Sequence, residues 1–279
     1  MAARGADLKG VNHDRRPQNT AAAGELGGAQ AGAQPSPPDD RNLKLCDYLT
    51  PALPTPPPAV DWLEKVTFPA GEMLNDQLGC CTCAGMGHAE QSWTANNGAE
   101  VTIPDADILA LYEAACGFDP SDPQGTDRGG DLLTVAKYVR AHGVGGHKLD
   151  AFVQVDLANL AEVQTAIWLF GGLYCGLNMP VSVMRATQAA VKAGQPIVWK
   201  APTVFDESAG GHCVYLGAYD GEGFDLVSWG FRVRADLAFW QACAEEALAL
   251  VSPEWCGAGK SPAGFDLPTL LADVKELSA

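Results

Sequence analysis

Positive charge is scarce in this sequence. Its 279 residues carry 18 Lys and Arg side chains against 34 Asp and Glu, which gives a formal net charge of −16 at pH 7. A surface of that sign repels phosphate backbones and anionic lipid headgroups. We therefore expect neither nucleic acid nor a membrane surface as a partner.

Long apolar runs are also missing. No run approaches the roughly 18–20 residues that a bilayer-spanning helix needs, and the first 20 residues lack the apolar core of a secretory signal. Hydrophobic residues still make up 47% of the chain, enough for one large domain or two small ones. These features favour a soluble protein, and we expect it in the cytoplasm.

A disulfide framework is not indicated. The nine cysteines are odd in number and unevenly spaced, which favours reduced thiols. Most are expected to pack as small apolar side chains. The cluster of Cys80, Cys81 and Cys83 needs a separate explanation.

Large apolar side chains are nearly absent from residues 1–42, so this stretch cannot offset its ordering entropy and is expected to be a disordered tail. Residues 43–60 contain PALPTPPPAV and predict an extended, proline-rich arm. A plain flexible tail is the preferred interpretation of the N-terminus, with a removable pro-segment as the alternative. A folded domain is expected over residues 61–279.

The periodicity of this domain changes along its length. Helical patterns and strand patterns follow one another in the sequence. Helices are predicted at 81–95, 105–115, 131–141, 160–169, 181–192, 236–250 and 267–277, and strands at 171–179, 197–200, 212–219 and 224–229. A helical half, about 61–170, followed by a strand-rich half, about 171–279, predicts the α+β class.

A chemically suggestive set of residues surrounds the cysteine cluster. The cysteines follow the loop LNDQLG (74–79) and lie at a predicted helix start. Free backbone N–H groups and the helix dipole favour a thiolate there. His212 follows two glycines at a predicted strand start, and an imidazole there could accept the thiol proton. Asn75 or Gln77, together with the cysteine's own N–H, could hold an oxyanion.

In their order, these motifs resemble the papain-like cysteine peptidases. The segment AVDW (59–62) resembles their mature N-terminus, and NDQLGCCTC (75–83) resembles their loop to the catalytic cysteine. DRGGDLLTVAKYV (127–139) resembles their second helix, and GGHCVYLGAY followed by SWG resembles the strands around their histidine and asparagine. The loop is also similar to that of uncharacterised bacterial and phage proteins, which makes a phage particle the alternative location.

The resemblance covers residues 58–279 and implies a fold and an activity. The fold would be papain-like and two-lobed, with a helical N-terminal lobe and an antiparallel, β-rich C-terminal lobe. The activity would be that of a thiol hydrolase acting on a peptide or amide bond of a peptide or protein substrate. No cofactor and no metal is implied.

The nucleophile is not settled by spacing. Papain-like enzymes place a glutamine six residues before the catalytic cysteine, an interval that joins Asn75 to Cys81 and Gln77 to Cys83. The bacterial and phage loops have their single cysteine at the position of Cys81. Trp62 lies 19 residues before Cys81, close to the interval in the family, and 21 before Cys83. The preferred pair is Cys81 with Asn75, and the alternative is Cys83 with Gln77.

One position departs from the family pattern. The asparagine that orients the histidine would precede SWG, where this chain has Val227. Valine cannot hold an imidazole tautomer. Asp225 lies on the same strand face about 6–7 Å away and is a weak substitute, while Trp229 is expected to shield the histidine or to fill core. We therefore predict a Cys-His dyad of Cys81 and His212.

Two other hypotheses stay open. The chain could be a catalytically inactive papain-fold protein with a binding or structural role, in a phage or elsewhere. It could also bind zinc through Cys80 and Cys83 with His88 or His212, although structural zinc usually needs two separated cysteine pairs. His88 is otherwise expected to be packed or on the surface, and His142 and His147 to be exposed near a helix end.

Overall fold

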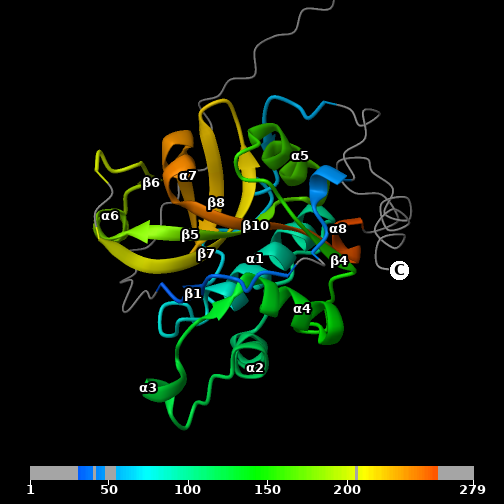
Figure 1. The fold of residues 1–279 in the computed structure, drawn as a ribbon, viewed down its shortest axis with the longest axis vertical. Helices are drawn as coiled ribbons and strands as arrows, with labels where there is room; N and C mark the ends of the chain where they lie inside the picture. The colour runs from blue at the N-terminus through cyan, green and yellow to red at the C-terminus, as the bar shows by residue number, and fades with distance from the viewer. Residues whose placement is uncertain (1–30, 40–41, 48–54, 205–206, 257–279) are drawn as a thin grey trace, which may run out of the picture.

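The computed structural model describes residues 31–39, 42–47, 55–204 and 207–256. The fold is α+β, with helices in the N-terminal half and an antiparallel sheet in the C-terminal half (Figure 1). The helices have the following bounds: α1 Cys81–Asn96, α2 Asp105–Cys116, α3 Pro123–Thr126, α4 Leu132–His142, α5 Leu160–Phe170, α6 Val181–Lys192, α7 Leu237–Cys243 and α8 Pro253–Cys256, with a short 3-10 helix η1 at Leu45–Asp47.

The strands form one sheet with the order β4-β10-β5-β7-β8-β9-β6, to which three short strands are attached. Their bounds are β1 Ala33–Gln34, β2 Val60–Asp61, β3 Gly130–Asp131, β4 Ala151–Gln154, β5 Leu173–Pro180, β6 Ile197–Trp199, β7 Ser208–Tyr219, β8 Gly223–Ser228, β9 Phe231–Asp236 and β10 Ala244–Val251. Neighbours along the main path are antiparallel, except β6 and β9, which pair in parallel.

Two apolar cores lie on the two faces of strand β7. Its side chains alternate, so Cys213 and Tyr215 join the core around α1, α2 and α4, whereas Val214 and Leu216 join the core beneath α5, α6 and α7. Helix α1 lies against β7 and is buried along Cys81–Ala95. The long central strand therefore contributes to both cores, and the His212 ring lies on the side of Trp199 and Trp229, which belong to the core of the β-rich half.

Local signals explain several helix starts. The Asp131 side chain accepts a hydrogen bond from the Thr134 backbone N–H (2.8 Å) at the start of α4. The Asn159 side chain accepts from the Glu162 N–H (3.3 Å) at the start of α5. Both are N-cap interactions that satisfy donors left free in the first turn. The helices predicted from the sequence over 81–192 are present, with ends shifted by at most one residue.

The prediction of one long helix over 236–250 is wrong. Helix α7 ends at Cys243, and Ala244–Val251 forms strand β10 between β4 and β5. Ala, Glu and Leu favour helix locally, but this segment is paired on both edges and its last five residues are buried, so tertiary contacts decide its structure. The helix predicted at 267–277 lies outside the described residues.

The N-terminal segment also differs from the expectation of disorder where it is described. Strand β1 pairs in parallel with β3 at Gly130 and antiparallel with β7 at Gly211, through Ala33 in both cases. Figure 1 shows it in blue beside α1 and next to β3. We call residues 31–39 the covering segment, because they lie over the start of α1, as the next section describes.

None of the helices in the described residues has both the length and the apolar character needed to cross a membrane.

Candidate active site

Cys81 is the first residue of helix α1 and is fully buried. Burial raises the pKa of its thiol, although the backbone N–H groups of Cys213, Gly32 and Thr82, which lie near the sulfur, act in the opposite direction. Two of these amides come from distant parts of the chain. The start of α1, strand β7 and the covering segment therefore meet at this sulfur.

His212 lies in β7, one residue before Cys213, and its ring is buried. Its Nε2 atom is 2.8 Å from the Ser228 hydroxyl oxygen. The ring stacks on Trp229, with centroids 4.1 Å apart and planes 12° from parallel. Burial lowers the pKa of His212 to about 3, so the imidazole is neutral at physiological pH. Nδ1 is buried and has no hydrogen-bond partner among the described residues.

Ser228 is the residue that sequence reasoning missed. Val227 stands where the family has its asparagine, and its side chain joins the core around α1. Successive side chains of a strand point to opposite faces, so the next residue, Ser228, presents its hydroxyl to the imidazole. Only Val227 and Asp225 were considered at this place from the sequence, and Ser228 was not. The serine of the SWG motif was the available signal.

The Asp225 side chain binds two arginines and not the imidazole in the contacts that the structure gives. Its carboxylate accepts hydrogen bonds from Arg232 (2.6 and 3.1 Å) and from Arg234 (3.1 Å), both on the neighbouring strand β9. These two guanidinium groups use both carboxylate oxygens. The idea that Asp225 substitutes for the missing asparagine gains no support from this arrangement.

The two candidate oxyanion donors lie in different surroundings. Asn75 is buried, and its Nδ2 donates to the carbonyl of Leu78 (3.2 Å), which closes the loop before α1. Gln77 is exposed, and its Nε2 donates to the carboxylate of Asp76 (3.2 Å). Of the two candidate oxyanion donors, the Asn75 side chain is therefore the buried one, fixed within the loop by its hydrogen bond to Leu78.

The alternative nucleophile lies in different surroundings from Cys81. Cys83 is fully buried and interacts with Cys116 at the end of α2 and with Cys80. Burial, followed by these neighbouring thiols, raises the pKa of Cys83. Cys80 donates weakly to the Met73 carbonyl (3.5 Å). Both thiols are thus fully buried, and they differ in their neighbours: other thiols surround Cys83, and backbone N–H groups surround Cys81.

The covering segment is held at both ends. The Gly32 carbonyl accepts from the Gly130 N–H (3.1 Å), the Ser36 hydroxyl accepts from the Leu133 N–H (3.2 Å), and Asp39 pairs with Lys137 (2.8 Å). The Glu246 carboxylate on β10 interacts with the Ser36 backbone and hydroxyl. Hydrogen bonds therefore fix this segment to both α4 and the sheet.

Gly32 allows the segment to pass unusually close to the loop. A Cβ atom at Gly32 would lie 2.2 Å from the Gly79 carbonyl oxygen, a backbone atom that cannot move aside easily. Any larger residue at this position would push the segment away from the start of α1.

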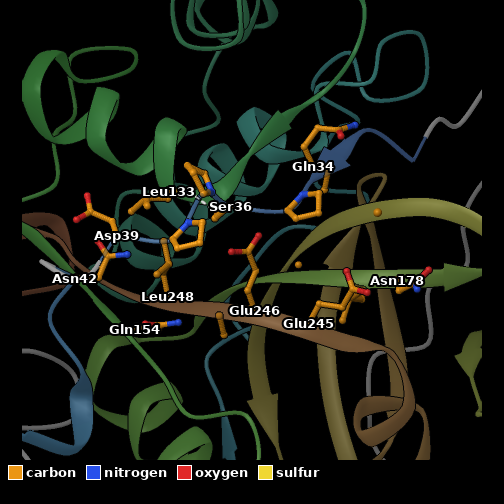
Figure 2. Close-up of a pocket in the computed structure, with 18 of the residues that line it drawn as sticks. Gln34, Ser36, Asp39, Asn42, Leu133, Gln154, Asn178, Glu245, Glu246 and Leu248 are labelled. Carbon is orange, nitrogen blue, oxygen red and sulfur yellow. Dashed lines mark hydrogen bonds between the residues drawn. The ribbon is translucent and has the colours of Figure 1, made fainter.

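A groove of about 600 Å³ runs between the covering segment and the sheet. In Figure 2, Gln34, Ser36 and Asp39 line one side, and Asn178, Glu245 and Glu246 line the other. The groove carries acidic side chains on both walls.

The zinc set that the sequence suggested is not formed. Within the part of the chain that the structure describes, a single group of three side chains could hold a metal ion: Glu90, His147 and Glu254. Cys80, Cys83, His88 and His212 do not form such a group. His88 is packed inside, where burial lowers its pKa to about 4.

No family model matches the sequence, and no curated protein does. Solved structures do match. Xylellain, a cysteine protease from Xylella fastidiosa, superposes with a TM-score of 0.60 over 80% of this chain and 97% of its own, at 15% identity. The fold is that of the papain-like cysteine proteases.

Two proforms share this papain-like fold. The ragweed pollen allergen Amb a 11, a cysteine protease in its proform, matches with a TM-score of 0.51 over 72% of this chain and 67% of its own, at 14% identity. Digestive procathepsin L 3 of Tenebrio molitor matches with a TM-score of 0.50 over 81% and 76%, at 13% identity. At these identities the likeness shows the fold and leaves the activity to be argued from the site.

Proposed function

We propose that this chain is a papain-like thiol hydrolase that cleaves peptide or amide bonds with Cys81 as nucleophile and His212 as base. The observation that carries the proposal is the meeting of Cys81 with the backbone N–H of Cys213, the residue that follows His212. The start of α1 and a backbone N–H of β7, 132 positions later in the sequence, converge on one sulfur. His212, the residue before Cys213, has a buried imidazole whose Nδ1 has no hydrogen-bond partner among the described residues.

The reaction proceeds in two steps. The Cys81 thiol gives its proton to Nδ1 of His212 as sulfur attacks the carbonyl carbon, and Asn75 with the Cys81 N–H stabilises the oxyanion. The imidazolium then protonates the leaving nitrogen, the C–N bond breaks, and a thioester remains. In the second step His212 takes a proton from water as the oxygen attacks the thioester. The acid is released, and the proton returns to the sulfur.

Ser228 selects the tautomer that this chemistry needs. When Nε2–H donates to the Ser228 oxygen, at the 2.8 Å observed, Nδ1 carries a lone pair and can accept a proton. Stacking on Trp229 keeps the ring plane fixed. Ser228 thus takes the orienting role that asparagine has in the family pattern.

The covering segment would hold the enzyme closed. Burial of Cys81 and His212 keeps both in their neutral forms, and the Gly32 amide lies near the sulfur. Movement of residues 31–39 would admit both water and a substrate. A closed form of this kind has a parallel among proteins of the same fold, because the cysteine protease Amb a 11 was solved in its proform.

The test is covalent labelling of the full chain by E-64, with the labelled residue identified by peptide mapping. Gly32→Ala should displace the covering segment and speed labelling of Cys81 at least about tenfold over the unchanged chain. Adding His212→Ala to Gly32→Ala should abolish that gain. Pro38→Ala, at an exposed position of the same segment, is the matched control and should label like the unchanged chain.

A second candidate is a papain-fold binding protein without turnover. Val227 at the asparagine position and the burial of the Cys81 thiol favour it. It predicts that Cys81 in Gly32→Ala reacts no faster than an ordinary thiol, with or without His212. That result would contradict the hydrolase proposal.

A further inference from the structure

Three potential metal ligands converge far from Cys81. They are Glu90 in α1, His147 in the turn after α4, and Glu254 in the first turn of α8. The Nδ1 atom of His147 lies 3.0 Å from Glu90 Oε1 and 3.1 Å from Glu254 Oε1. His147 was expected to be an exposed residue near a helix end, but it contacts two carboxylates.

Hydrogen bonding within the protein leaves this group incomplete. The Nδ1 atom of His147 forms a hydrogen bond with Glu254. Glu90 Oε1 is buried and lies at a similar distance from the same nitrogen, but it has no aligned hydrogen-bond partner among the described residues. A single N–H hydrogen serves one acceptor well, and a buried carboxylate oxygen without a partner is costly. A cation at the centre of the group would give this oxygen a partner.

The composition of the group leads to the same conclusion. Two carboxylates and one imidazole place their ligand atoms within 4.8 Å of one another. A divalent cation would balance the carboxylates and give every ligand atom a partner.

We propose that Glu90, His147 and Glu254 bind one divalent metal ion, with zinc as the best fit. Imidazole nitrogen and carboxylate oxygen are both zinc ligands, and bonds of about 2.0–2.2 Å require ligand atoms roughly 3.0–3.5 Å apart. The two measured separations fall at the short end of that range. The Glu254 side chain is 39% exposed, so water can reach the open side of the ion and complete its coordination.

The position of the site indicates a structural role. Glu90 follows Cys81 by nine residues of helix, about 13 Å along α1, so the ion does not touch the reacting atoms. The site connects α1, the turn at 144–147 and α8. The Asn97 side chain already bonds the Trp255 carbonyl (3.1 Å) in the same region. Zinc would strengthen the attachment of α8 to α1, and this inference does not depend on the proposed hydrolase activity.

The test is zinc binding by the full chain after removal of metals with a chelator. We expect one zinc per chain and a higher melting temperature with zinc than without it. Glu90→Gln and His147→Asn should each weaken zinc binding at least about tenfold and remove the shift. His142→Asn changes a nearby exposed histidine and should leave binding unchanged.

Cobalt separates this site from the cysteines. Co²⁺ bound by thiolates gives strong near-ultraviolet charge-transfer absorption, whereas Co²⁺ bound by nitrogen and oxygen does not. We expect the unchanged chain to bind Co²⁺ without that band, a measurement that holds even if a variant fails to fold. The proposal is overturned if zinc does not bind stoichiometrically, if Glu90→Gln binds it equally well, or if the thiolate band appears.

Discussion

At the residue scale, the site depends on which face of a strand each side chain occupies. Cys81 and His212 could be chosen as candidates from the sequence, because a cysteine at a predicted helix start and a histidine after two glycines at a predicted strand start are local patterns; strand β7 in fact begins earlier, at Ser208. The contact of Ser228 with His212 was harder to predict, because the SWG motif marks the serine but the contact itself depends on the register of β8 against β7. The alternation of side chains along β8 explains why Val227 belongs to the core.

Removal of the Ser228 hydroxyl should therefore impair the histidine. In the Gly32→Ala background, Ser228→Ala removes the hydrogen-bond partner of His212 Nε2, so the imidazole no longer prefers the tautomer with its proton on Nε2. We expect E-64 labelling of Cys81 to slow about 10- to 100-fold, in line with the loss of a group that orients a functional histidine. Ser252→Ala, which removes another buried hydroxyl, is the control. Equal labelling rates in the two variants would contradict the role given to Ser228.

His88 gives a residue-scale prediction for stability. Its pKa falls from 6.5 to about 4 on folding, so between these pH values the unfolded chain binds more protons. The free energy of unfolding should therefore decrease as pH falls from 6.5 towards 4, by up to about 3 kcal/mol from this group. Glu72 and Glu90, whose pKa values are raised to about 7, act in the opposite direction.

The contribution of His88 is isolated by comparison with His88→Leu. Urea unfolding of both proteins at pH 7 and pH 4.5 should show that the variant loses less stability on acidification. If the two proteins respond equally to pH, His88 does not remain neutral in the folded state.

At the element scale, local patterns and tertiary pairing compete. Helices such as α4 and α5 have capping residues and apolar faces that can be recognised from sequence alone. Strand β10 has a helix-favouring composition, and only its position between β4 and β5 makes it a strand. Strand β1 lacks large apolar residues, and its order comes from backbone pairing with β3 and β7, which no local signal reveals.

The attachment of the covering segment can be measured at one amide. The Gly130 N–H donates to the Gly32 carbonyl (3.1 Å). Ser36→Ala removes the acceptor for Leu133 N–H and should weaken the segment's attachment by about 1 kcal/mol. We expect hydrogen exchange at Gly130 to accelerate roughly fivefold, and Pro38→Ala to leave it unchanged. Unaltered exchange in Ser36→Ala would mean that the segment is held by other contacts.

At the scale of the whole molecule, the two lobes share one strand. Strand β7 gives Cys213 and Tyr215 to one core and Val214 and Leu216 to the other, so neither lobe has a complete core without it. The sequence predicted a helical half and a strand-rich half correctly. It could not show that the N-terminal segment returns to lie between them.

The shared strand predicts cooperative unfolding. Tryptophan fluorescence reports on both lobes, because Trp93 lies in the helical core and Trp199 and Trp229 lie in the β-rich core, and far-ultraviolet circular dichroism reports mainly on the helices. We expect urea transitions followed by tryptophan fluorescence and by dichroism to coincide. Transitions with separate midpoints would show that the lobes unfold independently.

The central claim is that Cys81 and His212 form a reactive pair once the covering segment moves. The most direct measurement is the pH dependence of Cys81 alkylation in Gly32→Ala. In Gly32→Ala we predict that Cys81 reacts substantially well below pH 8.5, the usual thiol pKa, because the imidazolium stabilises the thiolate. The double variant with Gly32→Ala and His212→Ala should lose this reactivity. A single ionisation near pH 8.5 in both proteins would contradict the account.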